Sequence, residues 1–217
     1  MQNLSSITQT SAGNIRIKKN LLIQGALQGS GNMGIGNVYL VWQTSKTAIM
    51  ADMTAKYGGV YYDDGSKMLH PDAGTGDGIA AAIASCKGGR NDYVLVGTGN
   101  YNLTVALTLA GKSSVHLLGI NGMNFDVSTV GAAALTQTGN FPAVTMEAYG
   151  ELAGFQIINK AGYPAVNLAE GIWRTQVHHN CFHMTQGAAC SIIDFSGTLT
   201  NSYGRIYANR FATWVGG

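Results

Sequence analysis

Hydrophobic and polar residues alternate with a period of two through most of the second half of the chain, which predicts β-strands rather than helices. Short β-rich runs, each ending in Gly or Asn followed by an aromatic residue, recur every 22 to 29 residues between Asp77 and Trp214. Repeats of this length cannot bury a hydrophobic face alone and have to stack on their neighbours. The pattern therefore predicts a coiled, parallel β-solenoid.

Two interleaved series of aliphatic residues set the expected register. One series has steps of 25 and 29 residues, the other has steps of 22 and 26, and all members are expected to face the core: Leu152, Val177 and Ile206, then Val144, Val166 and Ile192. The Gly or Asn in each turn is expected to adopt left-handed backbone geometry. Leucine-rich and hexapeptide repeats are excluded because neither their spacing nor their signature fits.

The chain divides into three parts. Residues 1–36 are interpreted as a polar, Gly-rich arm that is flexible or ordered by a partner, with short strands at 15–17 and 21–23. Residues 37–76 are interpreted as an attachment segment, with a strand from Val38 to Trp42 and a helix over 47–57 that ends at Gly58 and Gly59. Residues 77–217 then form the solenoid. Its capping helix, 77–87, is expected to have Asp77 as N-cap and Ile79 and Ile83 in the core.

Composition narrows the function classes. Hydrophobic residues make up 46% of the 217 residues, and only 11% are charged, against roughly a quarter in ordinary soluble domains. Low charge suggests that a partner covers much of the surface. A formal net charge of +2 gives no reason to expect nucleic acid, and no apolar run of about 18 residues predicts a membrane span. The polar start lacks a signal-peptide pattern, so we expect synthesis in the cytoplasm.

Chemistry-bearing residues are scattered along the predicted repeats. Five carboxylates occur singly: Asp126, Glu147, Glu151, Glu170 and Asp194. Glu147 and Glu151 flank a turn and are interpreted as solvated, and Arg205 and Arg210 as surface residues. The Asp-rich segments 63–66 and 72–77 are interpreted as turns rather than calcium loops. Residues 29–34 spell a dinucleotide fingerprint, but no βαβ unit follows it.

Histidine and cysteine offer the nearest approach to a metal cluster. By strand alternation His179 and His183 share a face with Cys181, while His178 points the other way. This grouping is interpreted as a side-chain ladder or as partly buried histidines. Cys86, Cys181 and Cys190 match no zinc pattern and are expected to be free, buried thiols. We therefore expect no catalytic residue, no metal and no cofactor. Tyr203, Tyr207 and Trp214 are candidates for glycan or partner contact.

The order of the N-terminal motifs resembles a known family. An Ala-rich helix, Gly-Gly, a strand at Tyr93–Val96 and Gly-Thr-Gly-x-Tyr-x-Leu at 97–103 are similar to the opening of right-handed parallel β-helices of the pectate-lyase-like superfamily. Residues 36–41 and 90–96 resemble virion structural proteins of tailed bacteriophages. The resemblance covers roughly residues 36–214.

This resemblance implies an all-β fold, a right-handed parallel β-helix capped by a short N-terminal helix. It also implies a non-enzymatic, homotrimeric virion component, located in head decoration, a head fibre or a spike. Such a protein contacts copies of itself, and its N-terminal region contacts other virion proteins. The alternative is a tailspike-type module that binds or depolymerises a host surface glycan. A secreted β-helix adhesin or lyase is a third hypothesis, which the missing signal peptide disfavours.

Overall fold

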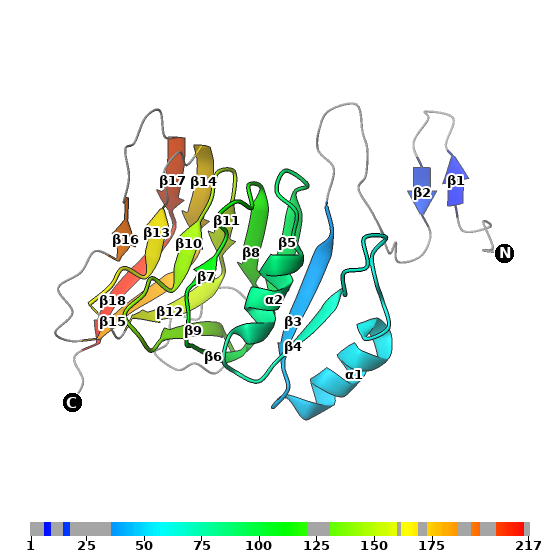
Figure 1. The fold of residues 1–217 in the computed structure, drawn as a ribbon, viewed down its shortest axis with the longest axis horizontal. Helices are drawn as coiled ribbons and strands as arrows, with labels where there is room; N and C mark the ends of the chain where they lie inside the picture. The colour runs from blue at the N-terminus through cyan, green and yellow to red at the C-terminus, as the bar shows by residue number, and fades with distance from the viewer. Residues whose placement is uncertain are drawn as a thin grey trace.

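The computed structural model describes residues 7–9, 15–17, 36–120, 131–159, 162–168, 173–185, 192–195 and 203–214. This part of the chain is predominantly β, and its three larger sheets are all parallel (Figure 1). β1 (Ile7–Gln9) and β2 (Ile15–Ile17) form a separate antiparallel pair, which confirms the strand expected at 15–17. The strand expected at 21–23 and the fingerprint at 29–34 lie outside the described residues.

Each parallel sheet is built from strands that are far apart in the sequence. The seven-stranded sheet contains β3 (Val38–Gln43), β4 (Leu69–Asp72), β5 (Asp92–Val96), β8 (Val115–Gly119), β11 (Glu151–Ala153), β14 (Trp173–His178) and β17 (Tyr203–Tyr207). The five-stranded sheet contains β6 (Gly99–Leu103), β9 (Ala133–Gln137), β12 (Phe155–Asn159), β15 (Cys181–Thr185) and β18 (Arg210–Trp214). The four-stranded sheet contains β7 (Leu107–Thr108), β10 (Val144–Met146), β13 (Val166–Leu168) and β16 (Ile193–Asp194).

From β5 onward the chain visits the three sheets in a fixed order, first the seven-stranded, then the five-stranded, then the four-stranded sheet. Each round of three strands makes one layer, and each strand pairs in parallel with its counterparts in the neighbouring layers. The last described layer contributes β17 and β18. The sequence prediction of a mainly β protein with parallel strands is therefore confirmed.

The hydrophobic register is confirmed in one series and corrected in the other. Leu152 pairs with Val177, and Val177 pairs with Ile206, as the spacing predicts. Val144 pairs with Val166, but the next partner of Val166 is Ile193. The expected partner, Ile192, was wrong by one residue. The step from Val166 to its partner is 27 residues (193 − 166) instead of the expected 26.

Most of the residues expected in the core are buried there. Ile79, Ile83, Val144, Leu152, Val166 and Val177 expose at most 3% of their surface, and Ile192 is half-buried against the same cluster. Ile206 is the exception, because it is 41% exposed whereas its register partner Val177 is 1% exposed. Phe211 is likewise 53% exposed, although it stacks on the buried Phe182. Among the described residues no strand pairs beyond β17 and β18, so this last layer has no covering layer.

Helices occupy the opposite end of the stack. α1 (Thr47–Tyr57) has the bounds predicted from its sequence, and α2 (Asp77–Ser85) packs against β3, β4, β5 and β7 (Figure 1). Asp77 is not the N-cap of α2, contrary to the sequence prediction. The N-cap is Gly76, with a left-handed φ of 85°, and the Cβ of any other residue would lie 2.5 Å from the Leu103 side chain.

A buried carboxylate takes over the capping role at α2. Asp72, at the end of β4, is 1% exposed. Its Oδ1 accepts the backbone N–H groups of Gly74, Thr75 and Gly76, and its Oδ2 accepts that of Gly78. Gly76 is the N-cap and Gly78 the second residue of α2, so two of these N–H groups are ones that a helix start leaves without partners, and a negative charge there also complements the helix dipole.

Left-handed residues mark the turns at both ends of the seven-stranded sheet. Just before this sheet, three successive layers have a non-glycine residue at positive φ, namely Asn91, Ser114 and Tyr149, and in the next layer Arg174 has one inside β14, where the register with β17 shifts. Just after it, the corresponding positions are Gly154 (φ 78°), His179 (φ 53°) and Ala208 (φ 51°). The expectation that Asn takes this geometry in the later turns was therefore wrong, because the left-handed residue precedes the Asn.

Asn180 and Asn209 instead form a ladder between layers. Asn180 is fully buried, and its side chain donates to the carbonyl oxygens of Leu152 and His178 and accepts from the N–H of Phe155. Asn209 repeats the arrangement one layer later, where it accepts from the Asn180 N–H and donates to the Val177 carbonyl. The ladder satisfies buried backbone groups at the corner between the two larger sheets.

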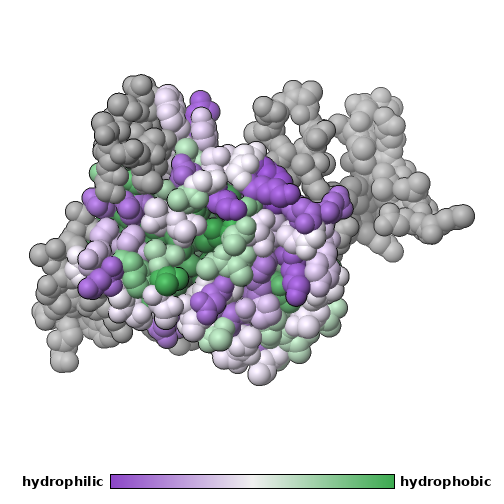
Figure 2. Space-filling model, in the orientation of Figure 1, coloured by the Kyte–Doolittle hydropathy of each residue, from purple (hydrophilic) through white to green (hydrophobic). Residues whose placement is uncertain are grey.

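The surface of the stack is mixed in polarity. Figure 2 shows hydrophobic side chains gathered near β7 and β10, with polar groups around them. Exposed apolar residues beside this four-stranded sheet include Val105 and Tyr163. Neither helix in the described residues is long and apolar enough to cross a membrane.

Candidate functional site

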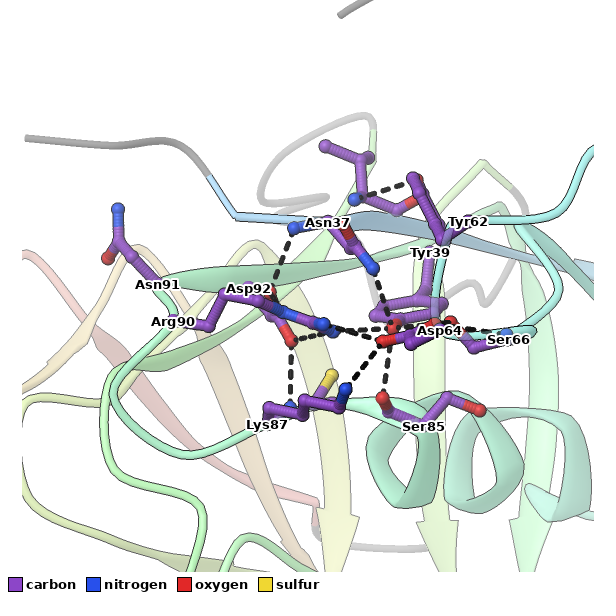
Figure 3. Close-up of polar contacts among 12 residues, drawn as sticks. Asn37, Tyr39, Tyr62, Asp64, Ser66, Ser85, Lys87, Arg90, Asn91 and Asp92 are labelled. Atoms are coloured by element: carbon purple, nitrogen blue, oxygen red, sulfur yellow. Dashed lines mark hydrogen bonds and ion pairs between the residues drawn. The ribbon is translucent and has the colours of Figure 1, made fainter. Parts of the chain in front are cut away.

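The described residues contain two polar networks that are candidate functional sites. The first network surrounds Arg90 (Figure 3). The guanidinium group binds Asp92 through two hydrogen bonds of 2.7 Å, from Nε to Oδ1 and from Nη2 to Oδ2. It also donates to Asp64 Oδ2 at 2.6 Å and to the Tyr39 hydroxyl at 2.8 Å. Asp92 is fully buried and additionally accepts the backbone N–H groups of Asn37 and Lys87.

This network joins the attachment segment to the first layer. Hydrogen bonds to Asp92 raise the pKa of Arg90 above its usual range, so the guanidinium group stays charged. Asp64 accepts from the Ser66 N–H, as expected of a turn residue, but it also forms ion pairs with Arg90 and Lys87 that the sequence did not predict. Hydrogen bonds from Ser66 and Arg90 lower the pKa of Asp64. Every polar group is engaged within the protein, so we interpret this network as structural.

The second network lies on the seven-stranded sheet, and we call it the histidine–carboxylate cluster: His116, Glu151, His178 and His179. His116 Nδ1 is 2.8 Å from Glu151 Oε2, and His178 Nε2 is 2.8 Å from Glu151 Oε1. His178 Nδ1 is 2.7 Å from His179 Nδ1. His116, Glu151 and His178 expose only 13%, 21% and 13% of their side chains, while His179 is exposed. The four residues therefore form a hydrogen-bonded chain across β8, β11 and β14.

Aromatic rings cover both ends of this chain. Tyr93 stacks on His116 with the ring centres 4.4 Å apart, and Tyr207 stacks on His178 with the centres 4.7 Å apart. The carboxylate accepts from both rings, so His116 donates from Nδ1 and His178 donates from Nε2. Hydrogen bonding from His116, followed by that from His178, lowers the pKa of Glu151. This carboxylate is thus held ionised.

The cluster corrects two sequence predictions. Glu151 is not a solvated turn residue, because it belongs to β11 and is held by two histidines. His179 does not share a face with Cys181 and His183, since its left-handed φ interrupts the strand alternation and brings its ring against His178, with the centres 5.0 Å apart. Sequence spacing did not reveal His116 as a partner of Glu151, because their separation of 35 residues lies outside the repeat length.

Cys181 and His183 form a separate buried pair. Their Sγ and Nε2 atoms are 3.1 Å apart, and the residues are 0% and 3% exposed. Burial raises the pKa of the Cys181 thiol and lowers the pKa of His183. Both groups therefore stay neutral at pH 7, whereas a nucleophilic cysteine requires a thiolate. Cys86 is also buried, and desolvation raises its pKa to about 12. Cys190 lies outside the described residues.

The remaining candidates are distributed over the last layers. Tyr207 is 43% exposed, and its hydroxyl donates to Gln176 Oε1. Tyr203 and Trp214 belong to β17 and β18, where they pair with Trp173 and Thr185. The side chains of Tyr203 and Trp214 lie outside the described part.

The remaining charged candidates lie apart from one another. Glu147 Oε2 accepts the Gly111 N–H rather than approaching Glu151. Arg205 and Arg210 are exposed, as predicted. Asp194 ends β16, and Asp126 and Glu170 lie outside the described residues.

No protein family model, no curated protein and no solved structure matches the chain. Within the described ranges, no group of three or more His, Cys, Asp or Glu side chains is arranged to hold a metal ion. Function is therefore inferred from the geometry of this chain.

Proposed function

We propose that this protein is a non-enzymatic structural component of a bacteriophage virion, and that its layers form a right-handed parallel β-helix that assembles as a homotrimer. The fixed order in which the chain visits three parallel sheets supports the β-helix, and a parallel connection of this kind is right-handed in nearly all proteins. The virion location and the trimer come from the resemblance of residues 36–41 and 90–96 to phage structural proteins.

The observation that carries the proposal is the uncovered last layer. Phe211 is 53% exposed and its register partner Phe182 is 1% exposed, and Ile206 and Val177 differ in the same way. Stacked repeats need a polar terminal cap to remain soluble, and edge strands with free N–H and C=O groups readily pair with another chain. We expect other subunits of the trimer to cover the exposed Phe211 and Ile206 side chains.

The chemistry of the described carboxylates and thiols also supports a structural role. A general acid at neutral pH needs a raised carboxyl pKa, whereas the pKa of Glu151 is lowered. A nucleophilic Cys–His pair needs a thiolate, whereas the Cys181 pKa is raised. The cluster and the buried pair thus resemble side-chain networks that stabilise a stack.

Light scattering on the full chain and on matched variants tests the proposal. Wild type is expected to be a trimer. Phe211→Asp is expected to shift the mass towards the monomer, because burying a charged carboxylate at the subunit contact removes its hydration and is unfavourable. Ile49→Asp is the control, because Ile49 is 44% exposed on α1, away from the last layer. A monomeric wild type, or equal masses for the two variants, would contradict the proposal.

A glycan-binding role is the second candidate, and one observation favours it. Tyr149, Trp173 and Tyr207 are 47%, 39% and 43% exposed beside β11, β14 and β17. Exposed aromatic rings near a carboxylate suit the apolar faces of sugar rings. Binding of oligosaccharides by wild type but not by Tyr207→Ala would support this role, and a depolymerisation assay would separate binding from cleavage.

A further inference from the structure

Two consecutive histidines converge at the corner after β14, and their convergence depends on backbone geometry. Consecutive residues in a strand point to opposite faces. His179 instead has a φ of 53°, and the two Nδ1 atoms lie 2.7 Å apart, with the ring planes at 86°. A non-glycine residue in this conformation is strained.

Glu151 fixes the orientation and tautomer of His178 from the opposite side. The carboxylate accepts at 2.8 Å from Nε2, so the neutral ring presents the lone pair of Nδ1 to His179. A carboxylate on the far nitrogen of a histidine is the usual outer partner of metal-binding histidines, because it orients the ring and raises its basicity. Tyr207, stacked on His178, holds the ring plane.

The donor pair occurs in one layer of the described stack only. At the position of His179 the preceding layer has Gly154 and the following layer has Ala208, both with positive φ. Neither residue carries a donor side chain. The left-handed turn is thus a feature of the fold, and His179 adds a second imidazole to it.

We propose that His178 Nδ1 and His179 Nδ1 bind one divalent transition-metal ion, of the Zn²⁺, Ni²⁺ or Cu²⁺ class that imidazole prefers. His179 Nδ1 carries the proton shared between the rings, and that proton moves through solvent to His179 Nε2 as the ion enters, so the ring stays neutral while Nδ1 binds the metal. Two bonds of 2.0–2.1 Å at a tetrahedral angle require the nitrogens to lie about 3.3 Å apart. The rings therefore separate by a fraction of an ångström.

The site has two protein ligands among the described residues, so the remaining coordination positions are open to water or to a small ligand. Such an open site binds less tightly than a structural zinc site with four protein ligands. His179 is exposed, which gives the ion a path from solvent. The proposal is independent of the virion role.

Titration calorimetry of the full chain with ZnCl2 and NiCl2 tests the proposal. Wild type is expected to bind one ion per chain. His179→Gly is expected to weaken binding at least tenfold without unfolding the chain, because glycine accepts the positive φ. His70→Ala is the control, because its ring contacts the Lys67 carbonyl and not the cluster. Equal affinity of His179→Gly and wild type, or no binding by wild type, would overturn the site.

Glu151 is tested as a positioning residue. Glu151→Gln is expected to weaken metal binding about 10- to 100-fold. Ring nitrogen chemical shifts are expected to show the Nε2–H tautomer of His178 in apo wild type and a mixture of tautomers in Glu151→Gln. Unchanged tautomer and affinity in this variant would remove Glu151 from the proposal.

Discussion

Replacing Asn180 with Ala removes the fully buried member of the asparagine ladder. The Asn180 side chain accepts from the Phe155 N–H at 3.1 Å and donates to the Leu152 carbonyl at 2.9 Å. Leu152 and Phe155 are fully buried. Alanine would leave the Phe155 N–H without its acceptor and without access to water, and it would remove one donor from the Leu152 carbonyl. The matched variant is Asn209→Ala, because Asn209 makes the equivalent contacts in the last layer but is only half-buried.

The expected magnitudes differ between the two variants. A buried polar group that loses its partner costs about 1–3 kcal/mol, and a lost hydrogen bond to a carbonyl costs about 1 kcal/mol, so the Phe155 N–H and the carbonyls of Leu152 and His178 together predict a loss of about 4 kcal/mol for Asn180→Ala. Water can replace the lost partners at Asn209, which leaves a net cost of about 1 kcal/mol. The free energy of unfolding of ordinary domains is about 5–15 kcal/mol, so both variants should fold well enough to be measured.

Urea denaturation followed by circular dichroism measures both costs. The denaturation midpoint is expected to fall much further for Asn180→Ala, with an unchanged m-value, since both variants expose the same surface on unfolding. Equal losses for the two variants would refute the reasoning that the ladder satisfies buried backbone groups between layers.

Three further predictions concern stability. Asp72→Ala is expected to lose at least about 3 kcal/mol in chemical denaturation, because four N–H groups lose their acceptor, whereas Asp77→Ala is expected to lose under about 1 kcal/mol. Hydrogen bonding from His116 lowers the folded pKa of Glu151, so its contribution is complete above the ordinary carboxyl pKa of about 4.3 and disappears as pH falls through the folded value. Unfolding measured between pH 3 and 6 should therefore show a steeper acid loss for wild type than for Glu151→Gln. Ala208→Gly is expected to raise the melting temperature, because relief of about 1–2 kcal/mol of left-handed strain exceeds the entropic cost of about 0.4–1 kcal/mol; a lower melting temperature would contradict this.

Features set by local pattern were predictable from the sequence. The bounds of α1 follow from helix-favouring residues that end at Gly58, and the pairing of Leu152 with Val177 and Ile206 follows from their spacing. The buried face of α2 was also predicted, because Ile79 and Ile83 lie one turn apart. These features depend on residues close in sequence or on a regular repeat.

Features set by contacts between distant segments were not predictable. Asp72 caps α2 because β4 happens to end beside it, and Glu151 meets His116 because the intervening connection departs from the repeat length. His179 leaves the strand alternation because the corner after β14 demands a positive φ. Ile206 is exposed because burial of its side chain requires a neighbouring layer that covers it. The position of a residue within a repeat does not show whether such a layer is present.

Amide hydrogen exchange at low and high protein concentration tests the central claim most directly, namely that other subunits cover the last described layer. The account predicts that N–H groups of residues 203–214 exchange faster in dilute protein and become protected as the oligomer forms, while those of β8 and β9 stay protected throughout. Equal exchange of residues 203–214 at both concentrations, together with a change in mass, would place the contact elsewhere and contradict the claim.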